Sequence, residues 1–175
     1  RPYYVQFGIW LWKVLHGDLG RSLATGRPVT ADLAGAIANT LRLAVAASLI
    51  GFTMGCVLGG LAGTFRGSLI DRFATTLAVA GVSVPHYWLG MVLVVIFSVT
   101  LNWLPAMGAG PGGSADWSWN WDHMQHLILP AVTLSVIPMG IVTRTVRSIV
   151  AEIMNQEFVV ALRGKGLTTG GVFIH

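Results

Sequence analysis

The stretch Leu43-Ala-Val-Ala-Ala-Ser-Leu-Ile-Gly-Phe-Thr-Met-Gly-Cys-Val-Leu-Gly-Gly-Leu-Ala62 contains no charged residue. A helix of this length, rising about 1.5 Å per residue, crosses the roughly 30 Å of hydrocarbon in a membrane. We therefore predict a membrane span over about 40–63. Glycines recur at every fourth position, which predicts a ridge on one helix face where a second helix can approach closely; they are Gly51, Gly55, Gly59 and Gly63. A phosphate-binding loop is the weaker alternative, because its Gly-Lys-Ser/Thr ending is missing here.

Two further apolar segments follow. The second covers about 73–101 and is interrupted by Ser83-Val84-Pro85, where we expect a kink because proline removes a backbone hydrogen bond. The third covers about 127–146, with Pro130 expected in its first turn and Pro138 expected to bend it. The chain of 175 residues is 54% hydrophobic and 10% charged. Such a composition predicts an all-α fold, a polytopic transmembrane helix bundle with about three spans.

Residues 1–38 precede the first span and are mixed in character. An aromatic-rich stretch near Tyr3 to Leu15 predicts a short amphipathic helix at a membrane–water boundary. Thr30 is a candidate N-cap of another short helix, and we expect Asp18 and Arg21 to pair. We therefore divide the chain into an extracytoplasmic segment, 1–38, and a transmembrane domain, 39–175.

Charge asymmetry predicts the orientation. Arg66 and Arg72 follow the first span, and further basic residues follow the third, whereas the loop over 102–126 carries only Asp116 and Asp122. Because cytoplasmic loops are enriched in lysine and arginine, we place the 64–72 link and the C-terminal tail in the cytoplasm. The basic residues do not form a run dense enough for nucleic acid, so we expect membrane lipid as a partner and no nucleic acid.

Several polar residues near the spans have simple expected roles. Arg42 is expected to extend to the membrane interface, and Cys56 to act as a small packing residue. His123 and His126 are three residues apart but have no third ligand, so no metal site is predicted.

The proline break in the second span is a candidate border of a pathway, since a broken helix frees backbone carbonyl groups inside the membrane. The candidate lining residues are Ser83, Pro85, His86 and Tyr87. A kink that serves packing alone is the alternative. An intramembrane enzyme would need a nucleophile and a base, and a Ser83/His86 pair alone is not sufficient evidence for a catalytic site.

The stretch Phe158-Val-Val-Ala-Leu-Arg-Gly-Lys-Gly-Leu167 resembles the cytoplasmic "EAA" loop of bacterial ABC-importer permeases, and is closest to the dipeptide/oligopeptide branch, which also handles glutathione and nickel chelates. Further segments resemble that branch in order and spacing over nearly the whole chain: Gly17–Ser22, Arg27–Val29, Ser83–Gly90, Trp103–Ala106 and His126–Ala131. There are departures, since the acidic residue of the motif would fall at Val160, and Leu162 and Gly164 replace alanines. Such permeases usually have six spans, so the resemblance implies a partial chain of a type I transmembrane domain, without the first span and the last two.

The resemblance implies a permease subunit of an ATP-driven peptide importer in the bacterial inner membrane, with its C-terminal end cytoplasmic. Its cytoplasmic loop, 150–175, would form a short coupling helix that docks on an ATPase subunit. Phe158, Val159 and Leu162 would supply an apolar edge for docking, and Gly164 and Gly166 would end the helix. The residues that the resemblance assigns to coupling are Glu157, Phe158, Val159, Val160, Ala161, Leu162, Arg163, Gly164, Lys165 and Gly166. A solvated helix end is the alternative from periodicity alone.

The resemblance also implies the partners: a second, homologous permease subunit that would form a heterodimer with this one, two ATP-binding subunits and an extracytoplasmic substrate-binding protein. No catalytic residue and no cofactor are expected in this chain, since ATP and magnesium would bind to the ATPase subunits. The cargo stays open among dipeptides, oligopeptides, glutathione and nickel chelates. A passive channel or a helix-packing subunit of another complex is the rival function, but it does not explain the motif over 158–167.

Overall fold

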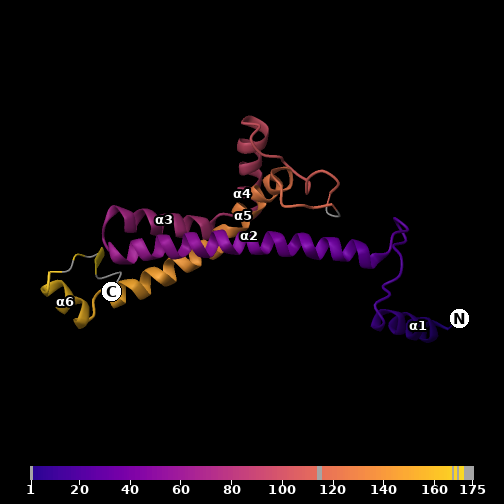
Figure 1. The fold of residues 1–175 in the computed structure, drawn as a ribbon, viewed down its shortest axis with the longest axis horizontal. Coiled ribbons are helices and arrows are strands. Elements are labelled where there is room, and N and C mark those ends of the chain that lie inside the picture. The colour runs from indigo at the N-terminus through magenta and orange to yellow at the C-terminus, as the bar shows by residue number, and fades with distance from the viewer. Residues whose placement is uncertain (1, 114–115, 167, 169, 172–175) are drawn as a thin grey trace.

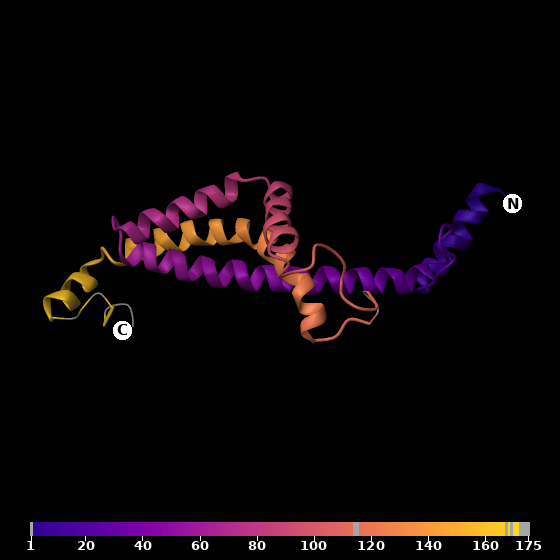
Figure 2. The ribbon, with the colours of Figure 1, turned by 90° about the horizontal axis from the view of Figure 1, so that it is seen from above.

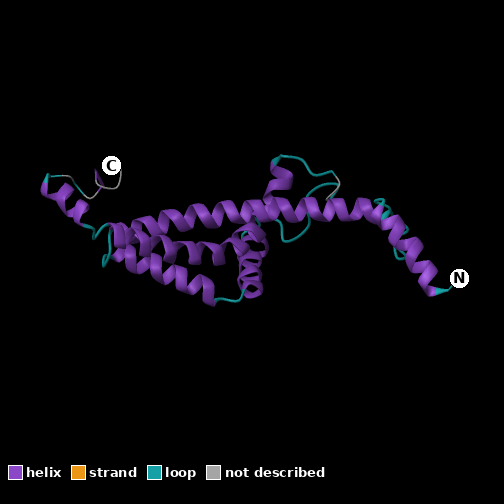
Figure 3. Cartoon of the chain, turned by 90° about the horizontal axis from the view of Figure 1, so that it is seen from below, coloured by secondary structure: helices purple, strands orange, loops and turns teal. Residues whose placement is uncertain are grey.

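The computed structural model describes residues 2–113, 116–166, 168 and 170–171, and within them the regular elements are helices (Figure 3). The predicted all-α fold is confirmed. In chain order the elements are α1 (Tyr3–Leu15), α2 (Val29–Thr64), α3 (Leu69–Ser83), α4 (His86–Val94), the π-helical segment η1 (Val95–Thr100), α5 (Trp121–Ile153) and α6 (Glu157–Gly164). Helices α2, α3 and α5 lie side by side, with α1 beyond one end of this bundle and α6 beyond the other (Figures 1 and 2).

Helix α2 is longer than predicted. It starts at Val29 directly after Pro28 and continues without a break to Thr64. Thr30 therefore lies inside the first turn, and the predictions of a separate short helix and of an N-cap at Thr30 were wrong. Asp32 complements the positive end of the helix dipole, and its carboxylate pairs with Arg27 at 3.1 Å.

The predicted kink in the second apolar segment is confirmed, and it is sharp. Helix α3 ends at Ser83, α4 begins at His86, and the two arms are bent by 104°. Val84 has an extended backbone, with φ −80° and ψ 129°, as the residue before a proline prefers. Helices α2 and α5 are each long and apolar enough to cross a membrane, and the bent pair adds a third crossing if it counts as one span.

Helix α5 begins at Trp121 rather than near Leu127, because the Asn120 side chain caps it by accepting from the His123 N–H at 3.1 Å. Pro130 thus lies well inside the helix, and its predicted place in the first turn was wrong. Figure 2 shows that the N-terminal part of α5 turns away from the direction of the remainder. The two internal prolines, Pro130 and Pro138, account for this change of direction.

The α2–α5 contact is built on the glycine ridge of α2. A Cβ atom added at any ridge glycine would come within 3.0 Å of an α5 backbone oxygen: Gly51 meets Ser135, Gly55 meets Met139, Gly59 meets Thr143 and Gly63 meets Arg147. Lipid tails are as apolar as leucine, so helices in a membrane associate through such close contact rather than through the hydrophobic effect. The large apolar side chains of α2 point outward instead, among them Leu49 and Phe52.

Candidate functional site

Helix α6 folds back on the end of α5 through a small apolar cluster. After Ile153 the chain breaks its helix over residues 154–156 and restarts at Glu157. Val159 is only 1% exposed and packs with the buried Met154 and the partly buried Val150 and Leu162. Figure 1 places α6 beyond the end of the bundle opposite α1.

The opposite face of α6 is open. Phe158 is 53% exposed and Val160 is 62% exposed, and the remaining exposed residues here are Glu157, Ala161, Gly164, Lys165 and Gly166. The three residues expected to form one docking edge therefore lie on two faces of α6. Val159 and Leu162 face the end of α5, whereas Phe158 is on the open face. Helix α6 ends at Gly164, and Gly166 has φ +89°, a conformation that favours glycine. The Arg163 side chain and Leu167 lie outside the described part of the chain.

A cavity of about 520 Å³ lies where α4 meets α5 and the following loop. His86 and Tyr87 line it from α4, and His126 and Thr133 line it from α5. The other two predicted pathway residues, Ser83 and Pro85, lie at the α3–α4 break outside this lining. The Ser83 hydroxyl donates to the Val79 carbonyl at 2.8 Å, which is a helix-internal bond and not a contact with His86.

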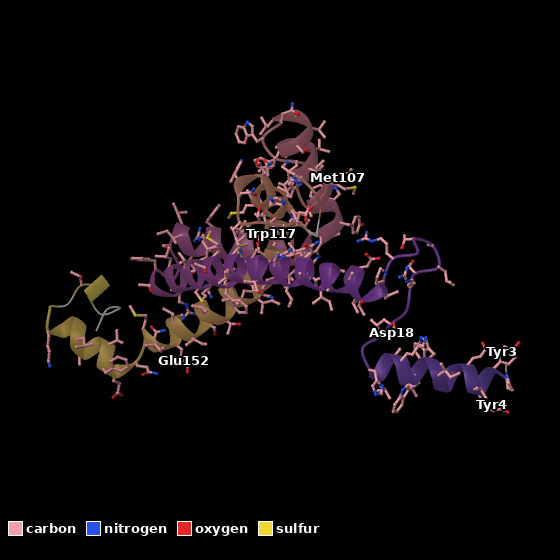
Figure 4. All side chains as sticks on the ribbon, turned by 45° about the vertical axis from the view of Figure 1, so that its right-hand side comes forward. Tyr3, Tyr4, Asp18, Met107, Trp117 and Glu152 are labelled. Atoms are coloured by element: carbon pink, nitrogen blue, oxygen red, sulfur yellow. The ribbon has the colours of Figure 1, made fainter. Side chains whose placement is uncertain are left out.

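The two histidines near the start of α5 hold the long loop that follows η1. The Nδ1 atom of His126 lies 2.9 Å from the Met107 carbonyl oxygen, and Nε2 of His123 lies 3.1 Å from that of Pro111. Figure 4 shows Met107 and Trp117 above the middle of the bundle, where this loop lies over α2. Both imidazoles thus bind backbone carbonyls of the loop that forms one wall of the cavity.

The same loop is attached to α2 through Arg42. Its guanidinium carbon lies 4.3 Å from the ring centroid of Trp117, and its Nη1 donates to Asn39 at 2.8 Å. Arg42 therefore has a protein contact in addition to any reach to the interface that its position predicts. In the N-terminal segment, 1–38, Asp18 accepts from the Gly20 N–H at 2.9 Å, and within the described residues the ion pair joins Arg27 to Asp32 rather than Asp18 to Arg21.

A buried ion pair that was not predicted from the sequence joins α3 to α5. Asp71 is 4% exposed, and both of its carboxylate oxygens accept from the Arg147 guanidinium, Oδ2 from Nη2 at 2.9 Å. Asp71 and Arg147 lie beside the predicted ends of the second and third spans. The available signal was the occurrence of one acidic and one basic residue at the same predicted end of two neighbouring spans.

Comparison with known proteins identifies the family to which the chain belongs. Residues 55–175 match the family described as binding-protein-dependent transport system inner membrane component. A Brucella abortus protein provisionally named a peptide transport system permease is 38% identical over 96% of this chain and 52% of its own length. The glutathione transport system permease protein GsiC of Salmonella typhimurium is 34% identical over 96% of the chain and 51% of its own.

The di/tripeptide transport system permease protein DppB of Pseudomonas aeruginosa is 33% identical over all of this chain and 57% of its own length. The chain thus spans about half the length of the curated relatives that it matches. The family match covers more than two thirds of the chain, including the α3–α4 break, the cavity at α4 and α6. This chain belongs to the family of binding-protein-dependent transport system inner membrane components.

Proposed function

We propose that this chain is part of the permease subunit of an ATP-driven importer of peptides in the bacterial inner membrane. The family membership and the peptide, di/tripeptide and glutathione permeases among its relatives support this proposal. The substrate class is therefore a short peptide or a peptide-like molecule. The chain would form one half of the path with a second, homologous permease, and a substrate-binding protein would deliver the cargo from outside.

The observation that carries the proposal is the division of α6 into two faces. Val159 fixes the helix to α5, while Phe158 and Val160 present exposed apolar area at the end of the bundle. An apolar helix face beside a basic residue, Lys165, fits a groove on a partner protein. We assign this face to the ATP-binding subunit, which binds the ATP and magnesium. This chain contributes the docking helix and no ATPase site.

This assignment needs α6 in the cytoplasm. The excess of arginine and lysine in the 64–72 link and the C-terminal tail supports that orientation. Helix α1 and the loop over 101–120 would then lie on the outer side, where the exposed aromatic side chains Tyr3, Trp12 and Trp119 suit a membrane interface.

The test is copurification of the full-length permease, together with its partner permease, with the ATP-binding subunits. Phe158→Asp and Val160→Asp place a charge in the docking face, and each should reduce the bound ATP-binding subunit at least about tenfold. Leu69→Asp is the matched control, since Leu69 is 81% exposed near the same end of the bundle but lies on α3. Equal copurification of all variants would refute docking through α6.

The cavity at α4 is the proposed part of the path in this chain. Tyr87 is exposed and lines the cavity, so a cysteine replacing it should react with a water-soluble maleimide in at least one nucleotide state. Ser83→Cys, which lies outside the lining, is the comparison. Protection of Tyr87→Cys in every state would contradict its place in the path.

A further inference from the structure

The Asp71–Arg147 pair holds three elements together at the end of the bundle that carries α6. In addition to the two-pronged contact with Arg147, Oδ2 of Asp71 accepts from the Gly67 N–H at 2.9 Å, and Oδ1 accepts from the Thr75 hydroxyl at 3.3 Å. The α2–α3 turn, α3 and α5 thus share one buried carboxylate. Removing one partner would leave a buried charge without compensation, which is costly. The pair is therefore expected to keep the α2–α3 turn, α3 and α5 in fixed positions.

The backbone of Arg147 also packs closely against α2. A Cβ atom at Gly59 would lie 3.2 Å from the Arg147 nitrogen, and one at Gly63 would lie 2.8 Å from its oxygen. The next turn of α5 carries Val150, which packs against Gly63 on α2 and against Val159 of α6. Contacts therefore run without interruption from Asp71 through Arg147 to α6.

Helix α3 connects the ion pair with the cavity at α4. Helix α3 begins near Asp71 and ends at the proline break, beyond which α4 supplies His86 and Tyr87 to the cavity wall. Helix α3 also packs on α5 through Gly140, where a Cβ atom would lie 2.6 Å from the Ala78 carbonyl oxygen, so packing and the ion pair together carry a displacement of α5 to α3. In the described residues, the Asp71–Arg147 pair is the ion pair that joins these two helices.

We propose that Asp71 and Arg147 are positioning residues that transmit movement of α6 to α3, and through the proline break to the cavity at α4. The inference rests on the proposed function, because it needs an ATP-binding subunit to displace α6. With the pair intact, α3 and the adjoining part of α5 move as one body. Without it, α3 follows α5 through packing alone, and the response of the cavity to nucleotide is much weaker.

The test uses the full-length permease in its complex with the partner permease and ATP-binding subunits, in lipid nanodiscs. The probe is a maleimide that reacts with Tyr87→Cys after the other cysteines of the permease have been replaced. Its rate is measured without nucleotide and after trapping with ATP, magnesium and vanadate. Asp71→Asn and Arg147→Gln should each reduce the nucleotide-dependent change in rate about tenfold. The double variant should show no further loss, because both changes remove one interaction.

Two neighbouring arginines provide matched controls. Arg72 follows Asp71 on α3, Arg144 lies one turn before Arg147 on α5, and both are exposed. Arg72→Gln and Arg144→Gln should keep the wild-type change in labelling rate. Asp71→Glu keeps the charge and should recover part of the response, which a loss of packing alone would not predict.

A wild-type response in Asp71→Asn and Arg147→Gln, with ATP-binding subunits still bound, would overturn the proposal. Additive losses in the double variant would also overturn it, because the two residues would then act separately. If either variant fails to assemble, the double variant Asp71→Leu/Arg147→Met decides: it removes the ion pair without leaving a buried unpaired charge, and an undiminished response in it refutes the proposal. A wild-type complex that binds no ATP-binding subunit, or shows no nucleotide response, contradicts the proposed function instead.

Discussion

At the residue scale, the glycine ridge of α2 has no space for a side chain between its backbone and α5. Three ridge positions show this most clearly, since a Cβ atom at Gly55, Gly59 or Gly63 would lie 2.7 Å from an α5 atom. Glycine costs a helix backbone entropy in water, and here that cost is offset by the close approach of two helices in lipid.

We predict that Gly59→Ala destabilises the full-length protein in detergent by about 1–3 kcal/mol, because α5 must move to make room. Thermal unfolding measures the effect. Gly8→Ala in α1 is the control, since nothing lies within 4 Å of the added methyl group and alanine is the better helix former. An unchanged melting temperature for Gly59→Ala would show that α2 and α5 do not pack as described.

Thr143 is a second residue of this interface with a testable cost. Its side chain is buried, and within the described residues its hydroxyl has no hydrogen-bond partner. Thr143→Val removes the unpaired hydroxyl at nearly constant volume and should stabilise the protein by about 1 kcal/mol.

Thr133→Val is the comparison for this change. The buried Thr133 hydroxyl donates to the Leu129 carbonyl at 2.8 Å, so the same substitution removes a bond that is made. Thermal unfolding should show stabilisation at 143 and none at 133. The reverse order would contradict the assigned hydroxyl environments.

The position of the glycine ridge can be predicted from the local sequence pattern, whereas the residues that contact it and the partner of Asp71 depend on tertiary structure. The repeat of glycine at every fourth position predicts a ridge, because helix geometry alone puts those residues on one face. It does not say which helix covers the ridge. The partner of Asp71 lies 76 residues away on α5, and sequence separation of that size carries no local signal.

At the scale of elements, the bend between α3 and α4 comes from a single proline. Proline predicts a break from sequence because its ring restricts the preceding residue and cannot donate a backbone hydrogen bond. The 104° angle could not be predicted, since it is set by the packing of α3 and α4 on α5 and by the loop that closes over them.

Replacing Pro85 with alanine should let α3 extend towards α4 and open the angle between them. Spin labels at Val79→Cys and Val95→Cys, both exposed positions on the two arms, report the change. We expect the distance distribution between the labels to become longer and broader. An identical distribution would show that packing alone maintains the bend.

In α6, neighbouring residues that are equally apolar in sequence differ in burial. Phe158 and Val159 are neighbours of similar apolarity, yet one faces open space and the other faces α5. Periodicity identifies the helix but not which of its faces turns inward, because Met154 and Val150 belong to a different element.

Val159→Ala should loosen α6 from α5 and raise hydrogen exchange of α6 amides about tenfold, or about 1.4 kcal/mol. Phe158→Ala should leave that exchange near the wild-type rate, since its side chain does not contribute to the cluster. Mass spectrometry of the full-length protein in detergent measures both. Equal protection of the two variants would contradict the division of α6 into a fixed face and an open face.

At the scale of the whole molecule, the membrane-spanning helices separate the N-terminal segment from the C-terminal one (Figure 1). Figure 4 shows Tyr3, Tyr4 and Asp18 at one end and Glu152 at the other. The apolar helices between them predict a membrane protein from composition alone. The order of the motifs predicts the family, which the comparison with known proteins confirms.

The open face of α6 is the proposed contact with the ATP-binding subunit. The most direct measurement is site-specific crosslinking of the assembled full-length complex with a photoreactive phenylalanine analogue placed at one position at a time. The proposal predicts a crosslink to the ATP-binding subunit from position 158 and none from the exposed position 69 on α3. A crosslink from 69 but not from 158, in a complex that still retains its ATP-binding subunits, would contradict it.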